Sequence, residues 1–114
     1  MRKRTDAISF RDALPAHGRG WSQRELCEID RVRAASGKRP QLELVTGESD
    51  EGDPWCVVCH EGERVLLHIA RIDRGYLIAR PYRSGLKRTE SITAATDLAL
   101  RWLDRELALG GRAG

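Results

Sequence analysis

The feature that most constrains this chain is a change in the period of its hydrophobic pattern near residue 41, with a second change near residue 90. Before the first change, Leu26, Ile29 and Val32 recur at helical spacing. Between the two changes, apolar residues alternate or run together, as they do in strands. After the second change an apolar stripe at helical spacing returns. Helices at both ends of a β-structured segment predict an α+β fold.

The first helix is expected over residues 22–36. In "WSQREL", Ser22 is a favourable N-cap residue and Glu25 follows three positions later, which is the pattern of a reciprocal capping box. At the other end, we expect Gly37 to adopt the left-handed conformation that often terminates a helix. Pro40 then blocks any continuation of the helix.

Four strands are expected to follow as an antiparallel meander. "QLELVT" alternates, "WCVVCH" and "ERVLLHIARI" are separated by a tight turn at Glu61–Gly62, and Asp73–Gly75 turns the chain into "YLIARPY". The next stretch, "RSGLKR", is expected to be a loop. Because the second and third strands are apolar on both alternations, we expect helices to cover one face of the sheet and the other face to be partly covered.

Thr89 or Ser91 is expected to cap the last helix. The predicted fold is therefore an α+β two-layer sandwich in the order α-β-β-β-β-α, with an antiparallel meander and the helices on one face. We divide the chain into a flexible basic N-terminal arm at residues 1–20 and a single α+β domain at residues 21–110.

The net charge of +3 lies in the N-terminal arm, where residues 1–20 carry five basic and two acidic side chains. The remaining residues are electrically balanced, so the basic pI is weak evidence for nucleic-acid binding. No apolar run is long enough to span a membrane, and the N-terminus lacks the apolar region of a secretory signal. We therefore expect a cytoplasmic protein with reduced cysteines.

Residues 56–60, "CVVCH", match the c-type haem attachment pattern letter for letter. The motif lies in a predicted strand, where residues three positions apart point to opposite faces. Cys56 and Cys59 would therefore be unable to hold one haem or one zinc ion. We expect buried strand cysteines, with no haem, metal or other cofactor.

The acidic loop after the first strand places four carboxylates within six residues: Glu48, Asp50, Glu51 and Asp53. Hard cations favour oxygen clusters of this kind, but the spacing is not that of an EF-hand. We interpret the loop as a structural turn and leave open cation binding or contact with a partner. Asp53 followed by "EGER" loosely resembles the core of restriction-endonuclease-like nucleases, although the lysine of that pattern is missing.

A second charged feature lies between residues 71 and 88, where basic side chains greatly outnumber acidic ones and Tyr76 and Tyr82 are interleaved. Basic groups alternating with aromatic rings are typical of surfaces that follow a phosphate backbone. Together with the arm, these residues are the candidates for nucleic-acid binding: Arg2, Lys3, Arg4, Arg71, Arg74, Arg80, Arg83, Lys87 and Arg88.

The stretches "SDEGDPWCVVC" and "ERVLLHIARIDRGYLIA" resemble a family of small alphaproteobacterial proteins. In that family a helix beginning near a "WS" pair precedes an acidic-Gly-Asp-Pro-Trp loop and an H-x-A-R-I-D strand. The resemblance covers roughly residues 21–80 and implies no particular activity. It favours a structural role for the loop and its surroundings, in which Arg71 pairs with Asp53 or Asp50; the residues concerned are Asp50, Glu51, Asp53, Trp55 and His68.

Together these observations favour a small bacterial binding or regulatory module without catalytic activity, which acts through contact with a protein partner or through self-association as a homodimer. The first alternative is a nucleic-acid-binding protein that uses the basic arm and the 71–88 cluster. The second alternative is a metal-dependent nuclease-like enzyme.

Overall fold

The structure is a computed structural model and describes residues 19–81 and 84–113. Apart from Arg19 and Gly20, the predicted basic arm therefore lies outside the described residues. The described chain forms two helices that flank a run of strands: α2 (Gln23–Ser36), β1 (Leu42–Glu48), β2 (Pro54–His60), β3 (Arg64–Ile72), β4 (Gly75–Arg80), β5 (Gly85–Thr89) and α3 (Ile92–Ala113).

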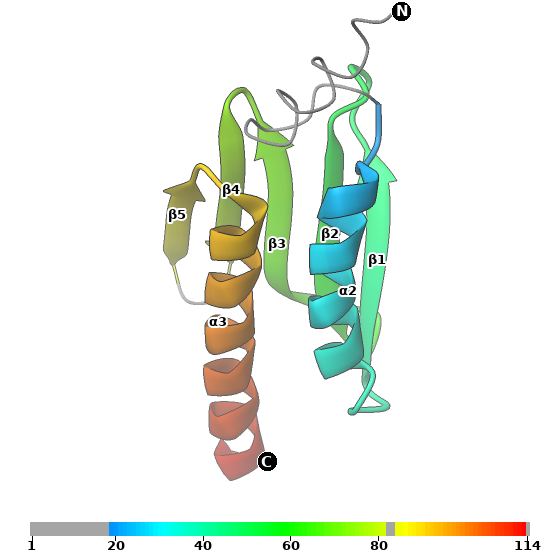
Figure 1. Cartoon of the computed structure of the whole chain (residues 1–114). Coiled ribbons are helices and arrows are strands. Elements are labelled where there is room, and N and C mark those ends of the chain that lie inside the picture. The colour runs from blue at the N-terminus through cyan, green and yellow to red at the C-terminus, as the bar shows by residue number, and fades with distance from the viewer. Residues whose placement is uncertain (1–18, 82–83, 114) are drawn as a thin grey trace, which may run out of the picture.

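The strands form one antiparallel sheet whose spatial order, β1-β2-β3-β4-β5, is the order of the sequence. Both helices lie side by side on the same face of this sheet, with α2 in front of β1 and β2 and α3 in front of β4 (Figure 1). The prediction of an α+β two-layer sandwich with an antiparallel meander is confirmed. We call the face toward the helices the inner face.

The sheet has five strands instead of the predicted four, because the segment expected to be a loop forms β5 (Gly85–Thr89). This strand pairs only with β4, and its side chains are mostly exposed. The strand has the sequence "GLKRT", with Leu86 as its one apolar residue. An edge strand that buries neither face leaves no alternating pattern in the sequence, and the prediction was wrong for this reason.

α2 begins and ends as predicted, but the backbone conformation of its C-cap residue differs from the prediction. The Ser22 hydroxyl accepts a hydrogen bond from the backbone of Glu25, and the Glu25 carboxylate accepts one from the backbone of Ser22, which completes the capping box. Gly37 is right-handed, with φ −65° and ψ −12°, and not left-handed as expected. Its N–H donates to the Arg33 carbonyl, so the helical hydrogen-bonding pattern extends to Gly37 and stops before Pro40.

The connection between β2 and β3 is the predicted tight turn. Glu61 and Gly62 have φ values of 56° and 71°, and the Glu63 N–H donates to the His60 carbonyl at 3.1 Å. Two consecutive residues with positive φ define a type I′ turn, whose twist matches that of the paired strands. The hairpin is therefore fixed by local turn chemistry.

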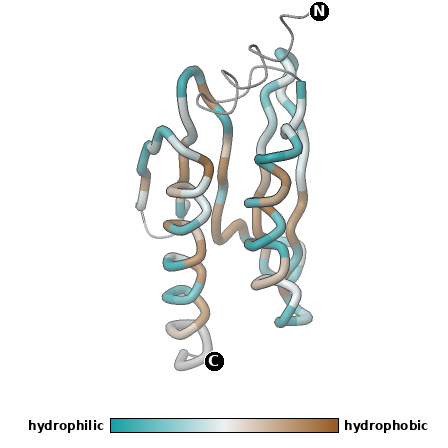
Figure 2. The backbone as a smooth tube through the Cα atoms, in the orientation of Figure 1, coloured by the Kyte–Doolittle hydropathy of each residue, from teal (hydrophilic) through white to brown (hydrophobic). Residues whose placement is uncertain are grey.

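The core lies between the inner face and the helices. Apolar stretches run along the central strands and recur along both helices (Figure 2), and the buried core residues come from these elements. Opposite Val58 and Cys59 of β2, strand β3 contains a β-bulge with Leu66 as the extra residue. Because of this bulge, the consecutive residues Leu66 and Leu67 both belong to the core. Among the described helices, none combines the length and the apolar character needed to cross a membrane.

Candidate binding surface

The strand register places a second set of side chains on the face of the sheet that lies opposite the helices. Gly47, Trp55, Ala70, Leu77 and Arg88 are successive neighbours across the five strands. A parallel row, two residues away, runs Val45, Val57, His68, Ala79 and Leu86. Since residues alternate faces along a strand, both rows lie opposite the buried row that contains Cys56, Ile69 and Ile78. We call the surface formed by the two rows the outer face.

The outer face is largely apolar. Its most exposed large apolar side chains are Leu86, at 67% relative exposure, and Val45, at 39%. The other apolar side chains of the two rows are half-buried against one another. No described helix packs on this side of the sheet (Figure 1). The sequence predicted that the second face of the sheet would be only partly covered, but it did not predict which residues form this surface.

Trp55 is held in place near the β1 edge of the outer face. Its indole ring lies directly over Gly47, where any Cβ would collide with the ring. A glycine opposite an aromatic residue on a neighbouring strand is a known way of filling the space that the missing side chain leaves. The Trp55 ring also makes an edge-to-face contact with His68, at 6.4 Å between ring centroids and 81° between planes. The ring is therefore presented by neighbours on β1 and β3.

His68 is the polar side chain in the middle of the outer face. Partial burial among its neighbours lowers the pKa of His68 below its usual 6.5, because desolvation disfavours the charged imidazolium. The imidazole is therefore predominantly neutral at pH 7. The centre of the surface thus carries no charge, although it contains an ionisable group.

The inner face contains a buried ionic cluster that the sequence did not reveal. Arg71 donates to Glu25 at 2.8 Å, and both side chains are 2% exposed. The Tyr76 hydroxyl donates to the other oxygen of the same carboxylate at 2.6 Å. Burial and this carboxylate raise the pKa of Tyr76, which keeps the phenol protonated. The expected pairing of Arg71 with Asp53 or Asp50 is wrong, because Arg71 points toward α2 and both aspartates are exposed.

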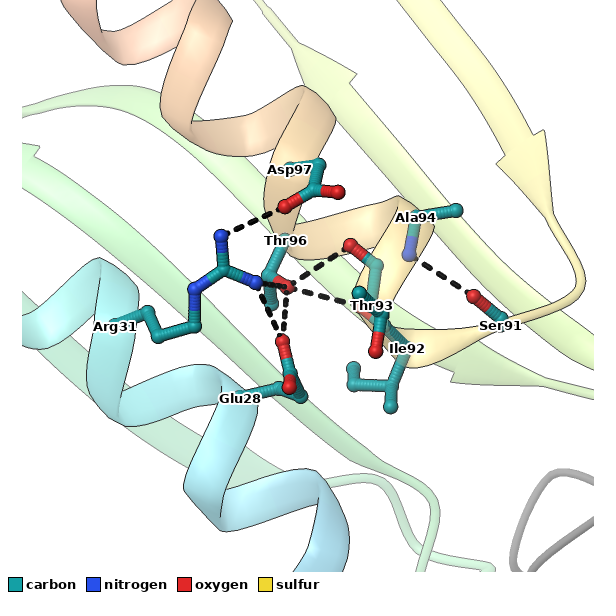
Figure 3. Close-up of polar contacts among 8 residues, drawn as sticks. All are labelled: Glu28, Arg31, Ser91, Ile92, Thr93, Ala94, Thr96 and Asp97. Atoms are coloured by element: carbon teal, nitrogen blue, oxygen red, sulfur yellow. Dashed lines mark hydrogen bonds and ion pairs between the residues drawn. The ribbon is translucent and has the colours of Figure 1, made fainter.

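A second polar cluster joins the two helices (Figure 3). Arg31 on α2 contacts Glu28 and Asp97, at 2.7 Å in each case, so that it bridges from its own helix to α3. Thr96 donates to Glu28 from α3 at 2.9 Å. The hydrogen bond between Glu28 and Arg31 is the main cause that holds the pKa of Glu28 below its usual value. These bonds link α2 to α3.

The acidic loop is organised by its own backbone and by Ser49. The Ser49 N–H donates to the Asp53 carbonyl at 2.8 Å, and the Ser49 hydroxyl accepts from the Asp53 N–H at 3.1 Å. The Gly52 carbonyl accepts from Gly20 at 3.0 Å, which ties the loop to the segment before α2. Asp50, Glu51 and Asp53 are exposed. This arrangement fits the structural interpretation of the loop.

The residues of the nuclease alternative are not brought together. Asp53 precedes β2, while Glu61 and Glu63 follow it, so seven strand residues separate them, or about 23 Å at ~3.3 Å per residue. Over residues 19–81 and 84–113, no three side chains of the His, Cys, Asp and Glu types gather where they could hold a metal ion. Asp53 is therefore not close to Glu61 or Glu63, as a metal ion shared by these carboxylates would require.

The cysteines of the "CVVCH" motif lie on opposite faces, as expected for an extended strand. Cys56 is part of the core, and its burial raises the pKa of the thiol to about 12. Cys59 pairs with Glu43 on the outer side and is half-buried. A thiol so difficult to ionise is a poor metal ligand and a poor nucleophile.

The basic residues proposed for nucleic-acid binding are dispersed. Arg71 is buried beneath α2, and Arg80 is stacked on the Trp102 ring of α3, 4.3 Å from its centre. Arg88 lies on the outer side and donates to the Asp73 carbonyl at 3.2 Å, whereas Lys87 is one residue away and so points to the other side. Arg74 is exposed in the β3–β4 turn. The remaining candidates lie outside the described residues: Arg2, Lys3, Arg4 and Arg83.

Comparison of the chain with protein-family models, with curated proteins and with solved structures finds no match. Of the features described above, the outer face alone combines apolar side chains, partial exposure and continuity across all five strands.

Proposed function

We propose that this protein is a binding module without catalytic activity and that it acts by docking another protein surface onto the outer face. The observation that carries the proposal is the continuous apolar surface across the five strands, with Leu86 at 67% and Val45 at 39% exposure. Contiguous apolar patches on a folded protein are typical of protein-binding sites. Trp55, an aromatic residue held in a fixed orientation, has the character of an interface hot spot.

The alternatives receive less support from the geometry. Phosphate-backbone binding needs several cations on one surface, and Arg71 and Arg80 are committed to Glu25 and Trp102. Nuclease activity needs converging carboxylates, and those considered lie at opposite ends of β2. Docking requires only the exposed apolar area, which is present.

Site-specific photo-crosslinking in cells tests the proposal. A photoreactive amino acid in place of Leu86 reports on the outer face, and the same amino acid in place of Ala34 reports on the exposed surface of α2. We expect a discrete covalent adduct of defined mass from position 86 and none from position 34. Adducts that form only from position 34, or from neither position, would contradict docking on the outer face.

A further inference from the structure

The chemistry of the outer face specifies its partner more closely. We infer that the partner is a second copy of this chain, and that two copies pack their outer faces against each other as a two-fold homodimer. This inference rests on the proposed function, because it assumes that the outer face is the docking surface.

The size of the surface fits a dimer. Five strands about 4.8 Å apart make the sheet roughly 24 Å wide, and the seven residues of β1 and of β2 make it roughly 23 Å long. Two such faces in contact bury about 1,100 Å² in total, which exceeds the ~1,000 Å² that separates specific interfaces from incidental contacts. Sheets pack face to face at about 10 Å with interdigitating side chains, as in a β-sandwich.

The charge pattern of the outer face is self-complementary. Its interior, as far as the described residues extend, holds Trp55, Val57, Leu77 and the neutral imidazole of His68. Charged side chains occur at two opposite corners: Glu43 on the β1 edge, in the row of Cys59, and Arg88 on the β5 edge, in the row of Leu77. No like charges therefore need to be brought together at the centre of the interface.

The two corners also fix the relative orientation of the copies. In a two-fold dimer, a residue at one corner meets the partner's residue at the mirrored position. We place the two-fold axis between the two sheets, perpendicular to the diagonal that joins Glu43 and Arg88. Glu43 of each copy then faces Arg88 of the partner copy, which gives two such contacts in the dimer. The strands of the two sheets then cross at a large angle, which is the orthogonal class of sheet packing.

Pairing through the sheet edges is less favourable than pairing through the faces. β5 is only five residues long and carries Lys87 and Arg88, and β1 carries Glu43 and Glu48. Short, charged edge strands resist the addition of another strand. Over residues 19–81 and 84–113, the outer face has no comparable protection, which makes it the surface that a second copy covers.

Sedimentation equilibrium of the full chain at near-physiological salt tests the inference. The purified protein should show a concentration-dependent mass approaching twice the 12.8 kDa of one chain. Leu86→Asp and Val45→Asp, at positions exposed enough to leave the fold intact, should each weaken dimerisation at least tenfold. Ala34→Asp on α2 should leave the dissociation constant unchanged. Circular dichroism verifies that each variant is folded.

Charge exchange tests the orientation. Glu43→Arg should weaken the dimer several-fold, and adding Arg88→Glu should recover most of the loss. A mass of one chain at all concentrations would overturn the inference, as would a dimer that both outer-face variants leave unaffected. If the chain is monomeric but position 86 still crosslinks to a different protein in cells, the outer face is a docking surface and its occupant is not a second copy. If position 86 gives no adduct at all, the proposed function itself fails.

Discussion

Val57 and Val58 are neighbours in β2, and the sheet sends them into different surroundings. Val58 is 1% exposed beneath the helices, whereas Val57 is half-buried on the outer face beside His68. The same contrast holds along the strands, because alternate residues contribute to a finished core and to an apolar surface on which none of the described helices packs. The two faces have similar composition and differ in what covers them.

This difference suggests a division of labour within one small domain. The inner face buries one matched set of polar groups, Glu25 with Arg71 and Tyr76. The outer face avoids charge at its centre and keeps its charged groups at the corners. A surface with a core-like composition and partial exposure is suited to being buried by association, since the hydrophobic free energy is still available.

The largest effect should come from breaking the ionic cluster on the inner face. Glu25→Gln preserves the capping-box geometry, because glutamine also serves at this position, but removes the negative charge that faces the buried Arg71 guanidinium. Removing one partner of a buried ion pair costs about 3–5 kcal/mol. We expect a loss of this size in the free energy of unfolding, measured by urea denaturation.

Glu28→Gln is the matched control for this substitution. Glu28 lies on the same helix and also pairs with an arginine, but Arg31 is 41% exposed and keeps Asp97 as a second partner. Exposed ion pairs contribute about 0–1 kcal/mol, so the control should be nearly neutral. Equal losses of unfolding free energy in the two variants would mean that the buried pair of Glu25 and Arg71 contributes no more to stability than the exposed pair of Glu28 and Arg31.

The two valines provide a direct comparison of the faces. Val58→Ala should reduce the free energy of unfolding by roughly 1.5–3 kcal/mol, because the side chain is fully buried in the monomer. Val57→Ala should cost clearly less at low protein concentration, where the outer face is free. As the concentration rises, the cost of Val57→Ala should grow while that of Val58→Ala stays constant, because association stabilises only the side chain it buries.

A cost for Val57→Ala that does not depend on concentration would show that the outer face gains nothing from association. Thermal unfolding at several concentrations spanning two orders of magnitude gives this measurement, with the Ala34→Asp variant as the reference for a surface change outside both faces.

Local patterns in the sequence predicted the parts of this fold that depend on neighbouring residues. The capping box at Ser22 and the type I′ turn at Glu61–Gly62 are fixed by contacts over three residues, and both are confirmed. Gly37 fits a left-handed cap by residue type, yet its backbone stays right-handed. The edge strand β5 was missed because it buries too little to produce an alternating pattern.

The candidate site was harder to predict, because its groups meet through the register of the sheet. The ionic cluster of the inner face was missed for a related reason: Glu25 and Arg71 are 46 residues apart, and each has a sufficient local interpretation as a capping residue or as a strand cation. The apolar alternation of β2 and β3 indicated two apolar faces, but their rows are defined only once the pairing of all five strands is known. Residue types give the composition of a surface, whereas register gives its shape.

The smallest expected effect concerns His68 and the response of the outer face to pH. The pKa of His68 is lowered in the folded chain, so between pH 6.5 and the lowered value the unfolded chain binds more protons than the folded one. Stability therefore increases with pH across this interval, is fully present above pH 6.5, and is lost as the pH falls through the folded pKa. His68→Gln removes this contribution, so its unfolding free energy should depend less on pH below 6.5 than that of the wild type. The dimer desolvates His68 further, so the dissociation constant of the wild-type dimer should rise as the pH falls below 6.5. The dissociation constant of His68→Gln should stay constant over the same interval. If the wild-type dissociation constant is the same at pH 5.5 and pH 7.5, His68 does not lie in the interface, and the contact is restricted to the rows nearer Trp55.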